Sequence, residues 1–460
     1  MYAFTKSRVF REIKACLFLA VPLAGAQLAQ SAIAFVDTVM MGWLGSDTIA
    51  AGGLGATVFN TLLITATSIV SAVSPLAAEA FGAGNLKHVE RVVRQGLWLA
   101  LGLAIPITAL LLHAAGLLEK LGQAPDTIAL TTTYLNAIAW GIFPALGFAV
   151  LRYFVSALSL TRPIIIVMLL GTMLNIAGNY VLMLGKFGLP ALGLAGIGWA
   201  STISLWSMFL ALAIYIVVQP QLRHYRVLQT IHHFDLRVFQ NLLRVGAPIG
   251  ILTGTEISLF AVTALLMGQL GNTTLAAHQI ALQSAALTFN VPLGISIATT
   301  VRVGQQLGKG DRPGSQLAGY VGIGLGATFM AMTGLLFWLM PESIVSLYLN
   351  IHEPANATVV NLAKSLLGIA AVFQIADGIQ VTANGALRGR QDTYIPILIG
   401  LFAYWGIVLT SGYMLGMQFG YGGVGLWWGL AIGLTAAAIV LTWRFIVQPT
   451  SRAMGEAAQH

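Results

Sequence analysis

The chain has 460 residues, of which 57% are hydrophobic and only 8% are charged. Soluble domains carry roughly 25% charged residues, so this composition excludes an ordinary water-soluble protein and indicates an integral membrane protein. The net charge of +8 does not indicate nucleic-acid binding, because the basic residues lie between apolar segments. A single cysteine, Cys16, excludes an internal disulfide.

The N-terminal segment starts with basic residues and continues as an apolar run to about Leu44. This run is too long for a signal peptide, so we expect it to form the first membrane-spanning helix. Further apolar stretches of about 20 residues or more predict twelve spans in total, and their continuous hydrophobicity favours helices over barrel strands. The predicted spans lie near residues 15–40, 48–80, 93–115, 128–151, 163–185, 194–218, 240–268, 275–306, 315–340, 358–386, 394–417 and 423–447.

The basic residues are distributed unequally between the two sides of this predicted arrangement. An even number of spans places both termini on one side, and all but three of the 23 Lys and Arg lie on that side. The exceptions are Lys120, Lys186 and Lys364. Because basic residues concentrate in cytoplasmic connections, we expect both termini in the cytoplasm and a multi-pass protein of the plasma membrane, which is the inner membrane in a bacterium.

The two halves of the chain repeat. The segment MGWLGSDTIAA at 41–51 aligns without gaps with MGQLGNTTLAA at 267–277, and seven of the eleven positions are identical. The same offset of 226 residues pairs Pro22 with Pro248. An internal repeat of six spans gives both copies the same orientation, related by a pseudo-two-fold axis along the membrane normal.

The repeat predicts an all-α fold of two six-helix lobes joined by a polar linker. The expected parts are an N-terminal lobe over 1–222, a cytoplasmic linker over 223–237 and a C-terminal lobe over 238–460. Two such lobes are typical of transporters, because the cleft between them can open alternately to each side of the membrane. The chain contains no nucleotide-binding loop and no hydrolase motif, so we expect no enzyme activity and an ion gradient as the energy source.

Three acidic residues fall well inside predicted spans: Asp37, Glu256 and Asp377. At 1.5 Å per residue, Glu256 lies about 18 Å beyond Arg244, close to the middle of the bilayer. Asp377 lies at a similar depth and Asp37 lies in the outer half. Acids in a membrane usually face a cavity and serve a function, and no Lys, Arg or His is predicted at the same depth. We therefore expect the acids to bind a proton, a cation or a cationic substrate.

Asn175 and Asn179 are four residues apart, so they share one helix face at a depth where Asp37 could meet them. Their amide oxygens suit Na+, or a hydrogen-bond network around a protonatable acid. The alternative for Asn175 and Asn179 is that their amides only form hydrogen bonds that hold neighbouring helices together. Gln279 and Gln283 have the same spacing and are candidates to line a cavity.

Aromatic residues near the predicted spans divide into two groups. Phe373 lies one turn before Asp377 and is a candidate to line the same cavity. The tryptophans at span ends are expected to form an interfacial belt. These are Trp43, Trp140, Trp427 and Trp428.

The sequence as a whole resembles the multidrug and toxic compound extrusion (MATE) transporters, in particular their NorM branch. The resemblance rests on AFVDTVMMGWLG around Asp37, TGTEIS around Glu256, FQIADGIQ around Asp377, and the paired MGxLG segments. It implies a V-shaped twelve-helix protein that exports bulky, often cationic and aromatic compounds in exchange for Na+ or H+. It also implies that Asp37, Asn175 and Asn179 form a cation site of the N-terminal lobe, and that Glu256 and Asp377 form a pair in the C-terminal lobe.

Our functional hypothesis is secondary active efflux by a monomer, with Na+ or H+ as coupling ion and no other cofactor. Competition between the ion and a cationic drug or dye for one buried negative charge would link their opposite movements. Two acids close together favour a metal cation, so Glu256 and Asp377 are expected to hold Na+ if Na+ is used, and Asp37 is expected to be the more proton-like site. We expect the substrate to contact Asp37, Gln279, Gln283, Phe373 and Asp377.

Two alternatives are a flippase for a lipid-linked precursor and a membrane-embedded enzyme. A flippase would be expected to line its cleft with basic groups for phosphate, which the predicted spans lack. A membrane enzyme would need a His or Cys paired with the acids near a membrane surface, whereas the histidines lie mostly in loops.

Overall fold

A computed structural model describes residues 5–120, 122–227 and 232–447 of the chain. Within these ranges every regular element is a helix and no strand occurs, which confirms the predicted fold class. The elements of the first half are α1 (Lys6–Trp43), α2 (Ser46–Val70), α3 (Val73–Gly82), α4 (Leu86–Leu112), α5 (Ala114–Lys120), α6 (Pro125–Ile138), η1 (Ala139–Gly141), α7 (Ile142–Ala157), α8 (Arg162–Leu184), α9 (Leu194–Val218) and α10 (Pro220–Arg223).

The second half continues with the same helical character. Its elements are α11 (Leu236–Gln269), α12 (Asn272–Gly308), α13 (Arg312–Leu339), α14 (Pro341–Val345), η2 (Pro354–Asn356), α15 (Ala357–Gly389), α16 (Tyr394–Leu401), η3 (Phe402–Val408), α17 (Leu409–Tyr413), η4 (Met414–Gln418) and α18 (Gly422–Val447). The elements η3 and η4 are π-helical turns inside one continuous helix, whereas η1 and η2 are 3₁₀ turns.

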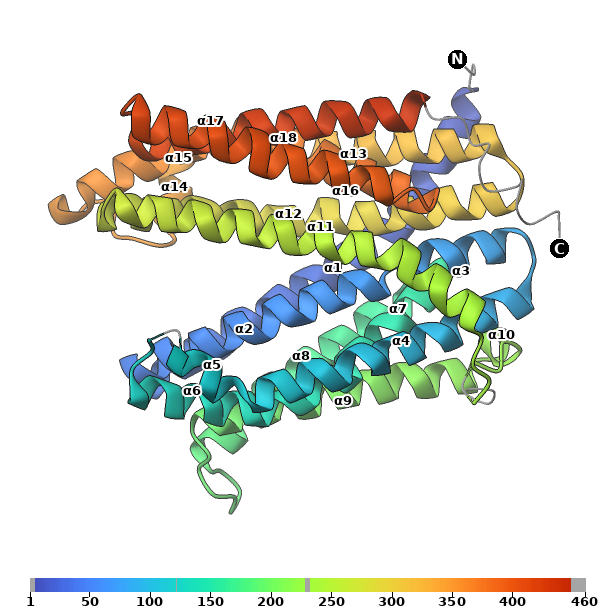
Figure 1. The fold of residues 1–460 in the computed structure, drawn as a ribbon, viewed down its shortest axis with the longest axis horizontal. Helices are drawn as coiled ribbons and strands as arrows, with labels where there is room; N and C mark the ends of the chain where they lie inside the picture. The colour runs from blue at the N-terminus through green and yellow to red at the C-terminus, as the bar shows by residue number, and fades with distance from the viewer. Residues whose placement is uncertain (1–4, 121, 228–231, 448–460) are drawn as a thin grey trace. The chain divides into compact units, whose positions relative to one another are not determined.

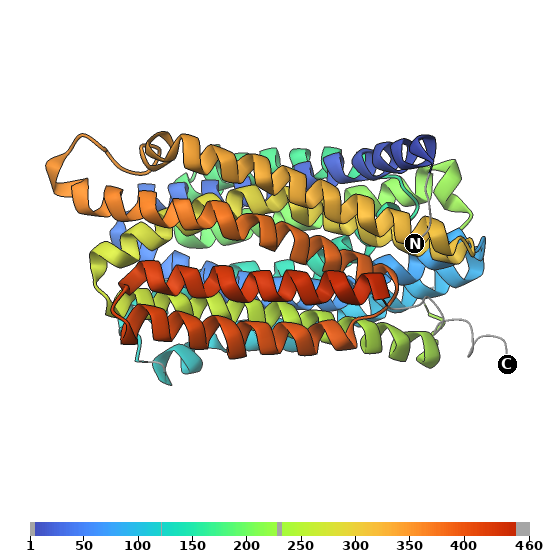
Figure 2. The same ribbon diagram turned by 90° about the horizontal axis from the view of Figure 1, so that it is seen from above.

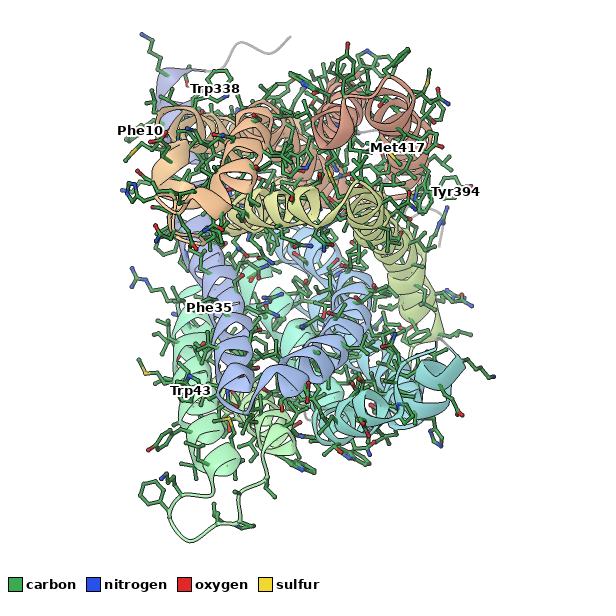
Figure 3. All side chains as sticks on the ribbon, turned by 90° about the vertical axis from the view of Figure 1, so that its left-hand side faces the viewer. Phe10, Phe35, Trp43, Trp338, Tyr394 and Met417 are labelled. Carbon is green, nitrogen blue, oxygen red and sulfur yellow. The ribbon has the colours of Figure 1, made fainter. Side chains whose placement is uncertain are left out.

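Twelve helices in the described ranges, some built from elements joined end to end, are long and apolar enough to cross a membrane. This number agrees with the twelve spans predicted from hydrophobicity. Large apolar side chains also cover much of the outer surface, and Figure 3 labels Phe35 and Trp43 of α1, which are 70% and 63% exposed. Such exposure suits contact with lipid and would be unfavourable in water. The chain is therefore a multi-pass membrane protein.

The helices pack as two units. The N-terminal unit comprises residues 25–250, and the C-terminal unit comprises residues 1–24 together with 251–460. These units follow contacts, whereas the two lobes predicted above follow sequence similarity, so they are different divisions of the chain. Helices α1 and α11 each contribute to both units, and each contains a proline, Pro22 and Pro248.

In the N-terminal unit, α7 is buried along nearly its whole length and contacts α2, α3, α4 and α9, while α8 packs along α9. Small residues allow α8 and α9 to approach closely. An added Cβ at Gly178 would lie 3.1 Å from the Cβ of Ala200, and Ser204 donates a hydrogen bond of 2.6 Å to the carbonyl of Gly171. This close packing fixes the polar face of α8 against α9.

In the C-terminal unit, α15 is the central helix and contacts α12, α13 and α18, which run lengthwise beside it (Figures 1 and 2). Hydroxyl groups join α12 to α15, because Ser296 donates to the carbonyl of Val381 at 2.7 Å and Thr300 donates to that of Gly385 at 2.8 Å. The buried face of α15 therefore has a fixed rotation relative to its neighbours, and this rotation positions Asp377.

Candidate functional site

Asp37 is the centre of a closed hydrogen-bond ring in the N-terminal unit. The amide of Asn179 donates to Oδ1 of Asp37 at 2.6 Å and to the side-chain oxygen of Asn175 at 3.3 Å. The amide of Asn175 donates to Ser201 Oγ at 3.0 Å, and Ser201 donates to Oδ2 of Asp37 at 3.2 Å. The structure thus brings together the three residues that the sequence predicted at this site and adds a fourth.

Three helices position this ring. Asp37 comes from α1, both asparagines come from one face of α8, and Ser201 comes from α9. Asn175 and Asn179 are fully buried, and Asp37 is 9% exposed. The predicted spacing of four residues on one helix face accounts for the two amides. Ser201 was missed because a serine in an apolar helix usually bonds to its own backbone, so its position in the sequence does not indicate a contact with Asp37.

The hydrogen bonds in the ring suit an ionised Asp37. Both carboxylate oxygens accept hydrogen bonds, and the donors are neutral groups. In the described part of the chain, no basic side chain lies within ion-pair distance of Asp37. The side-chain oxygen of Asn179 is buried and has no hydrogen-bond partner. The site therefore offers carboxylate, amide and hydroxyl oxygens, which suit a hard cation or a proton.

The C-terminal unit holds a second group of ionisable residues. Glu256 on α11 is half-buried and Asp377 on α15 is buried, and the two carboxylates interact electrostatically. Tyr404 on η3 interacts with both acids. The two acids therefore lie near one another, and that they form one cation site stays a prediction.

Arg388 lies at the end of the helix that carries Asp377. We expected Arg388 in the connection after a span that ends near residue 386, and α15 ends at Gly389, so Arg388 is in the last helical turn. Arg388 lies near enough to Glu256 for the two charges to interact. That no base lies at the depth of the acids stays a prediction.

Polar residues on α15 near Asp377 were also missed. Gln374 is fully buried, and its side-chain oxygen accepts hydrogen bonds from Thr288 at 2.8 Å and from Thr333 at 3.2 Å. Gln380 is 2% exposed and donates a hydrogen bond to the hydroxyl of Tyr404. Both glutamines lie three residues from Asp377, so the i, i+3 relation could have revealed them.

The other predicted substrate contacts have different environments. Gln279 and Gln283 on α12 are exposed. Phe373 is 2% exposed and packs in the core against Trp427, with ring centroids 5.4 Å apart. Their contact with a substrate stays a prediction.

Trp427 corrects the predicted interfacial belt. Trp43, Trp140 and Trp428 are exposed, but Trp427 is fully buried. Its indole N–H donates a hydrogen bond of 3.1 Å to Nδ1 of His278. Because the polar atom of this tryptophan has a partner inside the unit, it does not need the membrane surface.

Comparison with known proteins identifies the family. The MatE family model matches residues 22–181 and 248–414, which is more than half of the chain. The two matches start 226 residues apart, the same offset as the internal repeat. The chain is also 46% identical over 434 residues to a Synechocystis protein named "Probable multidrug resistance protein NorM", and the alignment covers 94% of each chain.

A second relative and a solved structure also resemble the chain over nearly its whole length. A Synechococcus protein of the same name is 43% identical over 448 residues, with 97% of each chain covered. Among solved structures, the crystal structure of MATE in complex with MaL6 matches the fold with a TM-score of 0.86 at 21% identity, covering 96% of this chain and 99% of that one. With these matches along nearly its whole length, the chain belongs to the MatE family, whose members are membrane transporters and not enzymes.

Proposed function

We propose that this protein is a secondary active exporter of bulky, mostly cationic organic compounds, driven by the inward movement of Na+ or H+. One observation carries the proposal: Asp37 is buried within a membrane-spanning helix and is held only by neutral hydrogen-bond donors. A carboxylate in this environment has a strong tendency to take up a positive charge. The relatives named above as probable multidrug resistance proteins support drugs as the cargo.

The exchange follows from binding equilibria. If a coupling ion and a cationic compound both depend on the same negative charge, binding of one lowers the affinity for the other. Alternating access between the two sides of the membrane then converts an ion gradient into export, provided that the ion favours one conformation over the other. In this proposal both termini are cytoplasmic, the membrane is the bacterial inner membrane, and the transporter works as a monomer.

The test is efflux from proteoliposomes that contain the purified protein and an aromatic cationic dye such as ethidium. Na+ and pH gradients are imposed separately, and the initial efflux rate is measured for the wild type and for Asp37→Asn. Asp126→Asn is the matched control, because Asp126 is an exposed acid in the first turn of α6. We expect at least one gradient to drive efflux in the wild type and in the control but not in Asp37→Asn. Dye retention by the wild type under both gradients would contradict the proposal.

A further inference from the structure

A buried pair of polar side chains adjoins the two acids of the C-terminal unit. The amide nitrogen of Gln380 donates a hydrogen bond to the hydroxyl oxygen of Tyr404. Gln380 is 2% exposed and Tyr404 is fully buried. The side-chain oxygen of Gln380 is also buried, and it has no hydrogen-bond partner. A buried carbonyl oxygen without a donor is costly, so this arrangement calls for an explanation.

The position of Tyr404 follows from the local backbone. Tyr404 lies in the π-helical turn η3, and such turns often occur at functional sites because they change the direction of a side chain. An added Cβ at Gly400 would lie 3.7 Å from the ring of Tyr404 and 2.2 Å from the side chain of Leu252. Leu252 lies one turn before Glu256 on α11. The absence of a side chain at residue 400 thus lets α16 approach α11 at Leu252, and Tyr404 follows one turn after this close approach.

The charged groups around this pair come from two helices, α11 and α15. Tyr404 lies near Glu256 of α11 and near Asp377 and Arg388 of α15. Gln380 lies three residues after Asp377, so the two side chains share one side of α15. With both acids ionised, this group carries a net negative charge. The unpartnered oxygen of Gln380 therefore lies in a region that attracts cations.

We propose that Gln380 is a selectivity residue of this site, which supplies a neutral oxygen ligand to Na+ bound by Glu256 and Asp377, and that Tyr404 is the positioning residue that orients its amide. The planar amide holds its nitrogen against the Tyr404 hydroxyl, so its oxygen points away from that contact. Na+ gains from each additional oxygen ligand, whereas a proton needs only one acceptor. This inference rests on the proposed ion-driven export and specifies how the C-terminal acids distinguish the two ions.

The C-terminal unit contains a second glutamine–tyrosine pair that can serve as a control for Gln380 and Tyr404. On α13, the amide of Gln316 donates a hydrogen bond of 2.8 Å to the hydroxyl of Tyr320, and Tyr320 packs against the ring of Phe445. The chemistry of this pair is the same, but it does not adjoin Glu256 and Asp377. Gln316→Leu and Tyr320→Phe therefore control for the loss of an amide or hydroxyl from a partly buried pair of the same kind in the C-terminal unit.

The experiment measures the Na+ concentration that gives half-maximal Na+-driven efflux, together with the rate of efflux driven by a pH gradient. For Gln380→Leu we expect the required Na+ concentration to rise about ten-fold, with pH-driven efflux unchanged. For Tyr404→Phe we expect a smaller rise. The double variant should resemble Gln380→Leu alone, because Tyr404 acts through Gln380. The two control variants should behave as the wild type.

Three results would overturn the inference. Wild-type Na+ dependence in Gln380→Leu would show that its oxygen binds no Na+. An equal loss of Na+-driven and pH-driven efflux would show that Gln380 has only a structural role. Wild-type efflux that responds to a pH gradient and not to Na+ would remove the Na+ site while leaving the proposed export intact. Export itself fails only if neither gradient moves the dye.

Discussion

The hydroxyl of Ser201 donates a hydrogen bond of 3.2 Å to Oδ2 of Asp37, across the interface between α9 and α1. Replacing Ser201 by Ala removes one of the two donors to the carboxylate and disfavours its ionised form. We expect the apparent affinity for a cationic dye to fall about five-fold, as for the loss of one hydrogen bond of ~1 kcal/mol. Equilibrium binding of the dye to the purified protein in detergent measures this affinity. Ser207→Ala is the control, because Ser207 bonds only to the carbonyl of Ile203 in its own helix.

Asn179 is expected to matter more than Ser201, because its bond to Asp37 is shorter and it also contacts Asn175. Asn179→Ala should therefore weaken dye binding by more than five-fold. The effect should disappear in the Asp37→Asn background, where there is no ionised carboxylate to stabilise. Additive losses in this double-mutant cycle would mean that Asn179 acts on packing and not through Asp37.

The three membrane acids should divide the two coupling ions. Asp377→Asn and Glu256→Gln are expected to weaken Na+-driven efflux, because the two acids lie near one another and in our proposal both bind Na+. Asp37→Asn should weaken efflux under a pH gradient together with dye binding, since Asp37 stands apart from other charges. All three amides keep the shape of the acid, so expression and membrane insertion should remain near normal. Efflux rates under each gradient, normalised to protein in the vesicles, test this; wild-type rates in all three variants would contradict it.

Two ion pairs join the first turns of α1 to other parts of the C-terminal unit, and the pairs should differ in strength. Glu12 accepts two hydrogen bonds from Arg302, at 2.7 and 2.8 Å, and this pair is largely buried. The pair of Arg8 with Asp311 is about one-third exposed. Glu12→Gln should lower stability by about 3 kcal/mol, because it leaves a buried guanidinium without its counter-charge. Arg8→Gln should cost less than about 1 kcal/mol.

The midpoints of thermal unfolding in detergent, monitored by fluorescence, compare Glu12→Gln with Arg8→Gln directly. A second comparison tests why Glu12→Gln loses stability. If the cost in Glu12→Gln comes from the uncompensated charge of Arg302, then adding Arg302→Leu should recover part of the lost stability. Equal midpoints for Glu12→Gln and Arg8→Gln would show that burial of the first pair does not matter.

The sequence by itself determined the twelve spans, the internal repeat and the three membrane acids. These features are local, because the length of an apolar run and the position of a charge within it do not depend on which helices become neighbours. The pairing of Asn175 with Asn179 was also accessible, since the period of one helix places them on the same face. For the same reason Gln380 could have been found from Asp377.

Only the tertiary structure decided which helix faces meet. Ser201 joins Asp37 because close packing of α8 on α9 brings its hydroxyl to the ring. The helix α16 approaches α11 at Leu252 because residue 400 has no side chain. Trp427 is in the core and not at the membrane surface because His278 supplies a partner for its indole. Hydropathy and helical period leave the rotation of each helix and the choice of its neighbours open. Those depend on contacts between residues far apart in the chain.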